Sequence, residues 1–214
     1  MHKIHQIKCK TDNCYIVDGG DAAILVDTGS AEAYDTVLRE CKKYPMRLIV
    51  LTHIHFDHAE NAARLSKELG VPVAFHKADM ELFENYNAQP LKSYGPIGRV
   101  VLGLSLKVLR DTKIEVPEKT IDVADGDDLS PYGIDAKIIE LPGHTKGSIG
   151  VDVENTSLLV GDALDHWIGT PALGHLYSNR SDLKDSAEKI RSLGERTVYY
   201  GHGKPTGNRF RMPR

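Results

Sequence analysis

The stretch Thr52-His53-Ile54-His55-Phe56-Asp57-His58 places four side chains that can bind metal within six residues. The largely apolar run 47–52 leading into it is typical of a strand covered on both faces. The apolar periodicity of 59–69 predicts a helix after it, with Gly70 as a stop signal. The stretch therefore falls between a buried strand and a helix, where α/β folds gather ligands and catalytic groups.

The spacing within this stretch divides its side chains between two ions. In an extended loop, alternate side chains point the same way, so His53 and His55 can share one ion. Asp57 and His58 lie at the next turn and can reach a second ion. Imidazole and carboxylate groups together suit zinc, iron, manganese or cobalt.

Three further residues share one sequence context, since each is preceded by glycine and follows a predicted strand. They are His144, Asp162 and His202, and the strands before them are predicted at 134–141, 157–160 and 197–200. Glycine lets the backbone turn sharply and approach closely, as a crowded site requires. The repeated context favours a shared role beside the first cluster.

The predicted elements fall into two halves of similar order. In the first half, strands are predicted at 4–8, 14–18, 22–27, 47–52 and 71–75, with helices at 31–43 and 59–69. In the second, strands are predicted at 134–141, 148–153, 157–160 and 197–200, with a helix at 182–193. Two sheets, each covered by helices on its outer face, satisfy this order, and we expect a single domain over 1–214.

Composition excludes several classes of protein. The 214 residues are 41% hydrophobic and 27% charged, with a formal charge of −3, which argues against nucleic acid or an anionic membrane as the main partner. No stretch reaches the length of a membrane span, and 1–19 lacks the apolar core of a secretory signal. We therefore expect a cytoplasmic protein whose three cysteines are reduced structural thiols. They are Cys9, Cys14 and Cys41.

The middle segment, 77–119, does not fit the sandwich order and is predicted to be an insertion. Its part 97–109 is apolar almost all round a helical wheel, so such a helix should be covered on most sides. It can pack plainly on the body, close over a pocket as a lid, or form a homodimer surface. Tyr94, before the rigid turn Gly95-Pro96, is placed to present an aromatic ring to a substrate.

Taken together, these motifs resemble the metallo-β-lactamase superfamily of binuclear metallohydrolases. The matching motifs, in order, are Asn13-Cys14-Tyr15, Leu25-Val26-Asp27-Thr28-Gly29, the Thr52–His58 stretch, Pro142-Gly143-His144-Thr145, Gly161-Asp162 and Gly201-His202-Gly203. The resemblance runs from about residue 13 to 203. It implies an α/β protein (α+β in some schemes) with the family's four-layer αββα sandwich and its metals at the shared edge of the two sheets.

The resemblance also implies a coordination scheme with two divalent ions, zinc as the first choice and iron or manganese as alternatives. His53, His55 and His144 would hold the first ion, and Asp162 would bridge to the second. The second ion's remaining ligands would be Asp57, His58 and His202. Asp27 resembles the family's carboxylate that orients a ligand histidine without binding metal.

The charge of such a site points to hydrolysis. Two divalent ions would leave the site positive after Asp57 and Asp162 are counted, and Asp57 and Asp162 are thus the expected catalytic carboxylates. Metal coordination lowers the pKa of water from ~15.7 toward ~7, so the site makes hydroxide at neutral pH. We expect metal-bound hydroxide to attack a small ester, thioester or lactone substrate.

Departures from known branches narrow this choice. The commonest metal-dependent β-lactamases have Arg at His58 and Cys at Asp162, and flavodiiron oxygen reductases have Glu at His55, so both branches are disfavoured. Glyoxalase-type thioesterases share all seven ligands, but only 204–214 stands here where they have a helical glutathione-binding domain.

Two alternatives stay open, an iron-dependent oxidoreductase of the persulfide dioxygenase type and, less favoured, a phosphodiesterase or nuclease. The segment 163–177 lacks the Gly-Arg-Thr-Asp run expected of the first, and the apolar insertion does not suit the second. Besides Tyr94, the residues expected to line the pocket are His166, Trp167 and His175.

Overall fold

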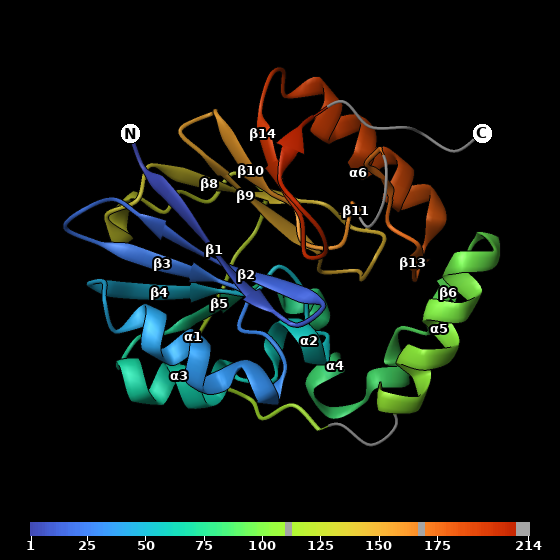
Figure 1. Ribbon diagram of the computed structural model, residues 1–214, viewed down its shortest axis with the longest axis horizontal. Helices are drawn as coiled ribbons and strands as arrows, with labels where there is room; N and C mark the ends of the chain where they lie inside the picture. Colours follow the sequence, from blue (N-terminus) through green and yellow to red (C-terminus); the bar gives the residue numbers. More distant parts are fainter. Residues whose placement is uncertain (110–112, 167–169, 209–214) are drawn as a thin grey trace.

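Two β-sheets pack face to face in the computed structural model, which describes residues 1–109, 113–166 and 170–208 (Figure 1). The first sheet has six strands in the order β1-β2-β3-β4-β5-β7. They are β1 (Lys3–Cys9), β2 (Asp12–Asp18), β3 (Ala23–Val26), β4 (Met46–Val50), β5 (Val73–Phe75) and β7 (Thr120–Asp122). Strands β1 to β3 are antiparallel, whereas β3, β4, β5 and β7 run parallel.

The second sheet has five strands in the order β15-β14-β10-β9-β8. They are β8 (Ala136–Glu140), β9 (Ile149–Val153), β10 (Ser157–Leu159), β14 (Thr197–Tyr199) and β15 (Thr206–Gly207). Only the β10–β14 pair in this sheet is parallel among the described strands. Short hairpins near the site complete the strands, namely β6 (Lys92–Ser93) with β13 (Leu176–Tyr177), and β11 (Leu164–Asp165) with β12 (Ala172–Leu173).

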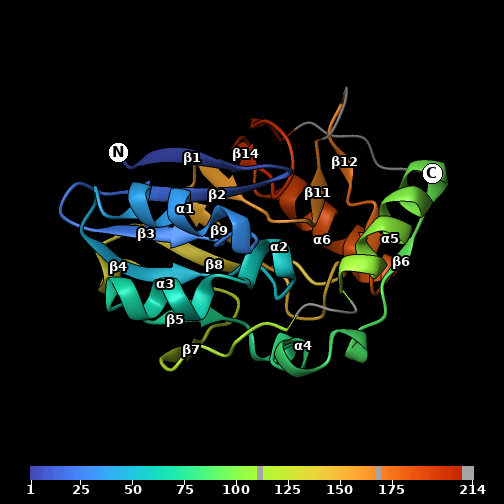
Figure 2. The ribbon, with the colours of Figure 1, turned by 60° about the horizontal axis from the view of Figure 1, so that its bottom comes forward.

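Helices cover the outer face of each sheet, as Figure 2 shows. On the first sheet lie η1 (Ala31–Ala33), α1 (Tyr34–Cys41), α2 (Phe56–Ala59) and α3 (Ala62–Leu69), and on the second lies α6 (Arg180–Ser192). Buried apolar residues form three clusters, one under α1 and α3, one between the sheets and one under α6. The predicted αββα sandwich is therefore confirmed. No helix in the described ranges is long and apolar enough to cross a membrane.

The predicted helix over 59–69 is wrong at its start, because the chain forms two helices there. Helix α2 ends at Ala59 and α3 begins at Ala62, and Asn61 lies between them. The Asn61 side-chain amide donates to the carbonyl oxygens of Thr28, Gly29 and Ser30 at 3.0, 3.1 and 2.7 Å. These hydrogen bonds connect the loop after β3 to the segment that carries the ligands His53 to His58.

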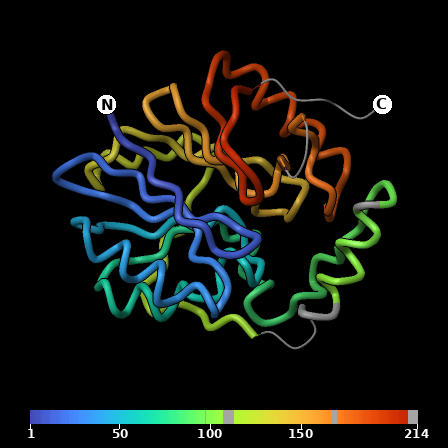
Figure 3. The backbone as a smooth tube through the Cα atoms, viewed as in Figure 1, coloured from blue at the N-terminus to red at the C-terminus, as the bar shows by residue number. Residues whose placement is uncertain are grey.

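The middle segment forms short helices and one long one before it rejoins the first sheet at β7. Its elements are η2 (Lys77–Asp79), α4 (Glu81–Glu84), η3 (Tyr86–Ala88), β6 and α5 (Gly95–Leu109). Helix α5 stands apart from the sandwich and approaches it near β13 (Figure 3). In the single chain, Val100 and Leu104 of this helix are 65% and 67% exposed, so the body of the protein does not cover this part of the described helix. A substrate or a second copy of the chain as its cover stays a prediction.

Candidate metal centre

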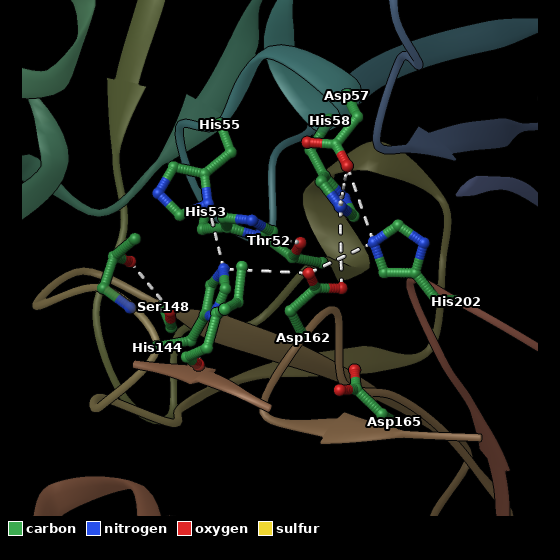
Figure 4. A network of polar contacts seen from close by, with 12 residues as sticks. Thr52, His53, His55, Asp57, His58, His144, Ser148, Asp162, Asp165 and His202 are labelled. Carbon is green, nitrogen blue, oxygen red and sulfur yellow. Dashed lines mark hydrogen bonds and ion pairs between the residues drawn. The ribbon is translucent and has the colours of Figure 1, made fainter. Parts of the chain in front are cut away.

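All seven side chains that the sequence singles out as ligands meet at one edge of the sandwich (Figure 4). The first sheet supplies four of them from the turn after β4 and from α2. The second sheet supplies the others from the loops that follow β8, β10 and β14, and these are His144, Asp162 and His202. Strand ends from both sheets thus converge on one centre, as the glycine contexts predicted.

Two groups of three ligands can each surround an ion. In the first group, one ligand atom from each of His53, His55 and His144 lies within 4.8 Å of the others. His55 Nδ1 and His144 Nε2 face each other at 2.9 Å, which identifies the nitrogens turned toward this position. In the second group, Asp57, His58 and His202 meet the same 4.8 Å limit.

Asp162 lies between these two groups and can contact both (Figure 4). Its Oδ2 is 3.7 Å from His144 Nε2 and 3.3 Å from His202 Nε2. Its Oδ1 is 3.5 Å from His58 Nε2. A carboxylate in this position can bridge two cations.

Several inward-facing atoms of the centre are buried without a hydrogen-bond partner among the described residues. They are His53 Nε2, His58 Nε2 and Asp162 Oδ1. His55 Nε2 also lacks a partner in the described part of the chain, but the His55 nitrogen that faces His144 at the centre is Nδ1. Leaving such a group unsatisfied costs about 1–3 kcal/mol each, so this concentration of them is unfavourable unless a ligand satisfies them. Nitrogen and carboxylate oxygen are the donors that divalent zinc, iron and manganese accept. The residues therefore fit a metal centre.

Hydrogen bonds on the outer side of the histidines fix the ring tautomers. His144 Nδ1–H donates to the Leu176 carbonyl at 2.9 Å, and His202 Nδ1–H donates to the Thr11 carbonyl at 2.8 Å. A carbonyl can only accept, so each ring must carry its proton on Nδ1. The Nε2 of each ring then faces the centre, where His144 Nε2 approaches His55 Nδ1 and His202 Nε2 approaches the carboxylates of Asp57 and Asp162.

Asp27 orients His58 in the same way. This buried carboxylate accepts from His58 Nδ1 at 2.9 Å and from the backbone N–H and the hydroxyl of Thr52 at 2.7 and 2.9 Å. Its backbone lies in the left-handed region, with φ of 61°, so the chain turns sharply to aim the side chain inward. Asp27 lies beside a ligand and outside the two ligand groups, the position that the family resemblance implies.

The electrostatics of the two groups differ. Burial, reinforced by neighbouring imidazoles, holds the pKa of His53 and of His55 well below the usual range, so both rings are neutral and offer lone pairs. Burial also opposes charge on His58, but Asp162, Asp27 and Asp57 outweigh it and raise the pKa of His58 to about 10. Without metal, the second group thus holds protons in the place of a cation, and metal binding would release them.

Beside the centre lies a cavity of about 420 Å³ with mostly apolar walls. On the side of the centre it is lined by five ligands, namely His55, Asp57, His144, Asp162 and His202. The other described residues that line it are Thr11, Phe56, Tyr86, Leu91, Val101, Leu104, Ser105, Asp165, His175 and Leu176. Leu91 directly precedes β6, and Val101, Leu104 and Ser105 belong to α5, so the middle segment shapes the cavity. Tyr86 stacks on the His55 ring with a centroid distance of 5.0 Å.

Only some of the residues that the sequence predicts for the pocket line the cavity. His175 lines the cavity, whereas Tyr94 and His166 are not among its described lining residues. The Tyr94 hydroxyl donates to the Leu173 carbonyl, and His166 Nδ1–H donates to the Lys204 carbonyl. Trp167 lies outside the described residues.

Sequence reasoning missed Asp12, Tyr86 and Asp79, all near the centre. Burial raises the pKa of Asp12 to about 7, and its Oδ2 has no hydrogen-bond partner among the described residues. The cysteines beside it, Cys9 and Cys14, are free and buried, as expected of reduced structural thiols. No local motif marks any of the three missed residues, because each reaches the centre through the fold alone.

The carboxylate of Asp79 links the loop that carries His55 to the loop that carries His144 through hydrogen bonds. Its Oδ1 accepts from Gly147 N at 2.8 Å and Gln89 Nε2 at 3.1 Å. Its Oδ2 accepts from the Thr145 hydroxyl at 2.6 Å and from Ile54 N at 3.4 Å. One buried carboxylate thus links the neighbours of His55 and His144.

Replacement of Asp79 by alanine is expected to lower the free energy of unfolding by about 3 kcal/mol, because buried donors lose their acceptor. Urea unfolding of the metal-loaded protein measures this loss. Asp79→Asn keeps one acceptor oxygen and should cost less than Asp79→Ala. Equal stability of Asp79→Ala and the wild type would contradict a fastening role.

A family profile described as the metallo-beta-lactamase superfamily matches residues 9–202. That range includes most strands of both sheets and all seven ligands, and the chain belongs to the metallo-β-lactamase superfamily. It is an enzyme of the hydrolase kind that binds divalent metal, and it is not a typical β-lactamase.

Individual relatives add detail. An uncharacterized protein of Mycobacterium leprae is 30% identical over 205 residues, which cover 91% of this chain and 87% of that protein. The hydroxyacylglutathione hydrolase of Nitrosomonas europaea is 25% identical over 205 residues, which cover 94% of this chain and 63% of that enzyme. A protein crystallised in a di-iron-bound form matches with a TM-score of 0.68 at 24% identity, covering 96% of this chain and 94% of its own; this likeness shows the shared fold.

Proposed function

We propose that this chain uses two divalent ions, zinc in the first instance, to hydrolyse a small ester, thioester or lactone. The observation that carries the proposal is Asp162, which lies between two groups of convergent, buried ligands at the edge of an apolar cavity. A binuclear centre explains this placement, because one bridging carboxylate satisfies both groups. Such a centre, when loaded, supplies hydroxide at neutral pH and stabilises developing negative charge.

The chain's own residues define what such a centre could act on. Leu91, Val101, Leu104 and Leu176 give the cavity apolar walls that suit a short acyl chain or an aromatic acyl group. Asp27 and the carbonyls of Thr11 and Leu176 hold three ligand rings in place from outside. The cavity is too apolar to favour a polyanionic strand, which argues against a nuclease.

Hydroxyacylglutathione hydrolase relatives support a thioester within this range of substrates. The chain spans 63% and 57% of the length of these two relatives, and we propose only the thioester class of substrate from them. We propose a small-molecule substrate, a cytoplasmic location, and a homodimer contact through the exposed Val100 and Leu104 of α5.

A second candidate is an iron-dependent oxidoreductase of the persulfide dioxygenase type, because the imidazole and carboxylate ligands of the centre also suit iron. Metal content separates the two functions. Two zinc or manganese ions per chain without visible absorption support hydrolysis. One iron per chain with oxygen consumption on a persulfide supports the oxidoreductase.

A substrate panel on metal-reconstituted protein tests the proposed function directly. The panel contains generic esters, thioesters, lactones and bis-p-nitrophenyl phosphate, each assayed before and after chelation. We expect turnover of at least one carbonyl substrate, loss of it with chelator and its return with zinc. Turnover of the phosphodiester alone, or of no carbonyl substrate with two metals bound, would contradict the proposal.

A further inference from the structure

A histidine–aspartate pair stands in the cavity wall and takes no part in either ligand group. His175 precedes β13, and Asp165 is the last residue of β11. Asp165 is 6% exposed, and its Oδ2 accepts from both the backbone N–H and the Nδ1–H of His175, at 2.7 and 2.9 Å. Both residues line the same cavity as the ligands His144, Asp162 and His202.

The imidazole of His175 is held rigidly in this position. The Tyr94 ring stacks on it, with a centroid distance of 5.5 Å and an interplanar angle of 5°. Tyr94 is itself fixed by its hydroxyl, which donates to the Leu173 carbonyl. Helix α5 reaches the same backbone at Gly98, where an added Cβ would lie 3.2 Å from the His175 carbonyl oxygen. A residue with a side chain at 98 would disturb this packing.

The pair leaves one nitrogen of the ring available. His175 Nδ1 is hydrogen-bonded to Asp165, and no hydrogen bond joins His175 Nε2 to another described residue. The His175 side chain is 22% exposed, in keeping with a ring whose free edge lies in a cavity wall. The hydrogen bond from His175 to Asp165 raises the pKa of the imidazole, which favours the doubly protonated ring.

The other proton donors of the described cavity wall are weaker candidates for acid catalysis. Burial raises the pKa of Tyr86 well above its usual range, so this phenol holds its proton tightly. Thr11 and Ser105 offer only aliphatic hydroxyls. The imidazoles of His55, His144 and His202 belong to the ligand groups.

We propose that His175, positioned by Asp165, is the general acid that protonates the leaving oxygen of an ester or lactone substrate; this rests on the proposed function. Hydroxide adds to the carbonyl carbon, and the bond from that carbon to the leaving oxygen then breaks. The leaving oxygen keeps the bond's electron pair and takes the proton from His175 Nε2. The neutral imidazole keeps its Nδ1–H bond to Asp165 and regains a proton from the newly formed carboxylic acid.

A leaving-group series tests this role. The substrates share one acyl group that the wild type cleaves and carry leaving groups from p-nitrophenol through phenol and trifluoroethanol to ethanol. Poor leaving groups need protonation, whereas p-nitrophenolate does not. General acid catalysis is typically worth about 10²–10⁴-fold, so His175→Gln should lower kcat for the ethyl ester by roughly 100-fold or more. The p-nitrophenyl ester should be nearly unaffected.

The chain offers a matched control in its other half. His5 pairs with Asp18 at 3.4 Å and contacts the Tyr44 ring at 5.2 Å, away from the cavity. His5→Gln should leave the whole series unchanged, and Asp165→Asn should show a weaker form of the His175→Gln pattern. Metal content should stay equal in all variants. Nitrogen NMR followed over pH should show that the neutral His175 ring of the metal-free protein carries its proton on Nδ1, and Asp165→Asn should weaken that preference.

The outcomes separate this inference from the function it rests on. Equal losses for all leaving groups in His175→Gln would show a merely structural role and overturn the inference alone. An unchanged series would overturn it as well. A metal-loaded wild type that cleaves thioesters but no ester or lactone would overturn the inference alone. One that cleaves no ester, thioester or lactone would contradict both the proposed function and the inference.

Discussion

Asp162→Ala should lose at least one metal ion and nearly all turnover. This carboxylate lies between the two ligand groups and approaches His144, His58 and His202. Its removal takes away the bridge and one negative charge that offsets the cations. We expect turnover to fall by roughly 10³-fold, the upper range for loss of one charged stabilising group.

Elemental analysis after gel filtration measures the metal loss, and steady-state kinetics measures the turnover. Asp35→Ala is a suitable control, since Asp35 is an exposed carboxylate on α1 with no role at the centre. Full activity in Asp162→Ala, or two ions still bound per chain, would rule out the bridging position.

The second large effect is expected for Asp27→Ala. The substitution removes the acceptor that fixes His58 and leaves the Thr52 N–H without its bond. Loss of such an outer partner typically lowers metal affinity by about 10–100-fold. Alanine must also adopt a φ of 61° here, and this left-handed backbone costs roughly 1–2 kcal/mol. Both stability and affinity for the second ion should therefore fall.

Asp27→Asn separates these two causes. Asparagine tolerates the left-handed backbone and retains an acceptor oxygen, but it cannot accept from Thr52 and His58 as a carboxylate does. We expect this variant to keep most of its stability and still bind the second ion more weakly, as measured by competition with a chelator. Unchanged affinity in both variants would mean that His58 is oriented without Asp27.

The ligand edge was predictable from the sequence because every ligand stands at a strand end. The stretch from His53 to His58 follows a long apolar run, and the glycine before His144 marks a sharp turn after another. Such signals are local, so periodicity and turn chemistry suffice to find them. The layer order followed from the same patterns.

Other features depend on contacts between distant segments and carry no local signal. Asp79 reaches Gly147 across 68 positions, and Tyr86 meets His55 only because the middle segment folds back over the centre. The break at Asn61 also arises from distant carbonyls, which compete with helix continuation. What covers α5 could not be predicted, because apolar periodicity reports composition and not what the fold brings to each face of a helix.

The division of ligands between the two sheets has a consequence for assembly of the protein. His53 and His202 stand 149 positions apart in the chain of 214 residues, and neither half alone provides both complete ligand groups. Coordination by ligands from both halves requires the long chain segment between them to form a closed loop, and closing this loop costs conformational entropy. A metal ion therefore cannot direct the folding of one half before the other half is in place. In the proposed binuclear centre, the ions would hold the two sheets together at this edge. We therefore expect chelation to loosen the ligand edge while the cores under α1 and α6 persist.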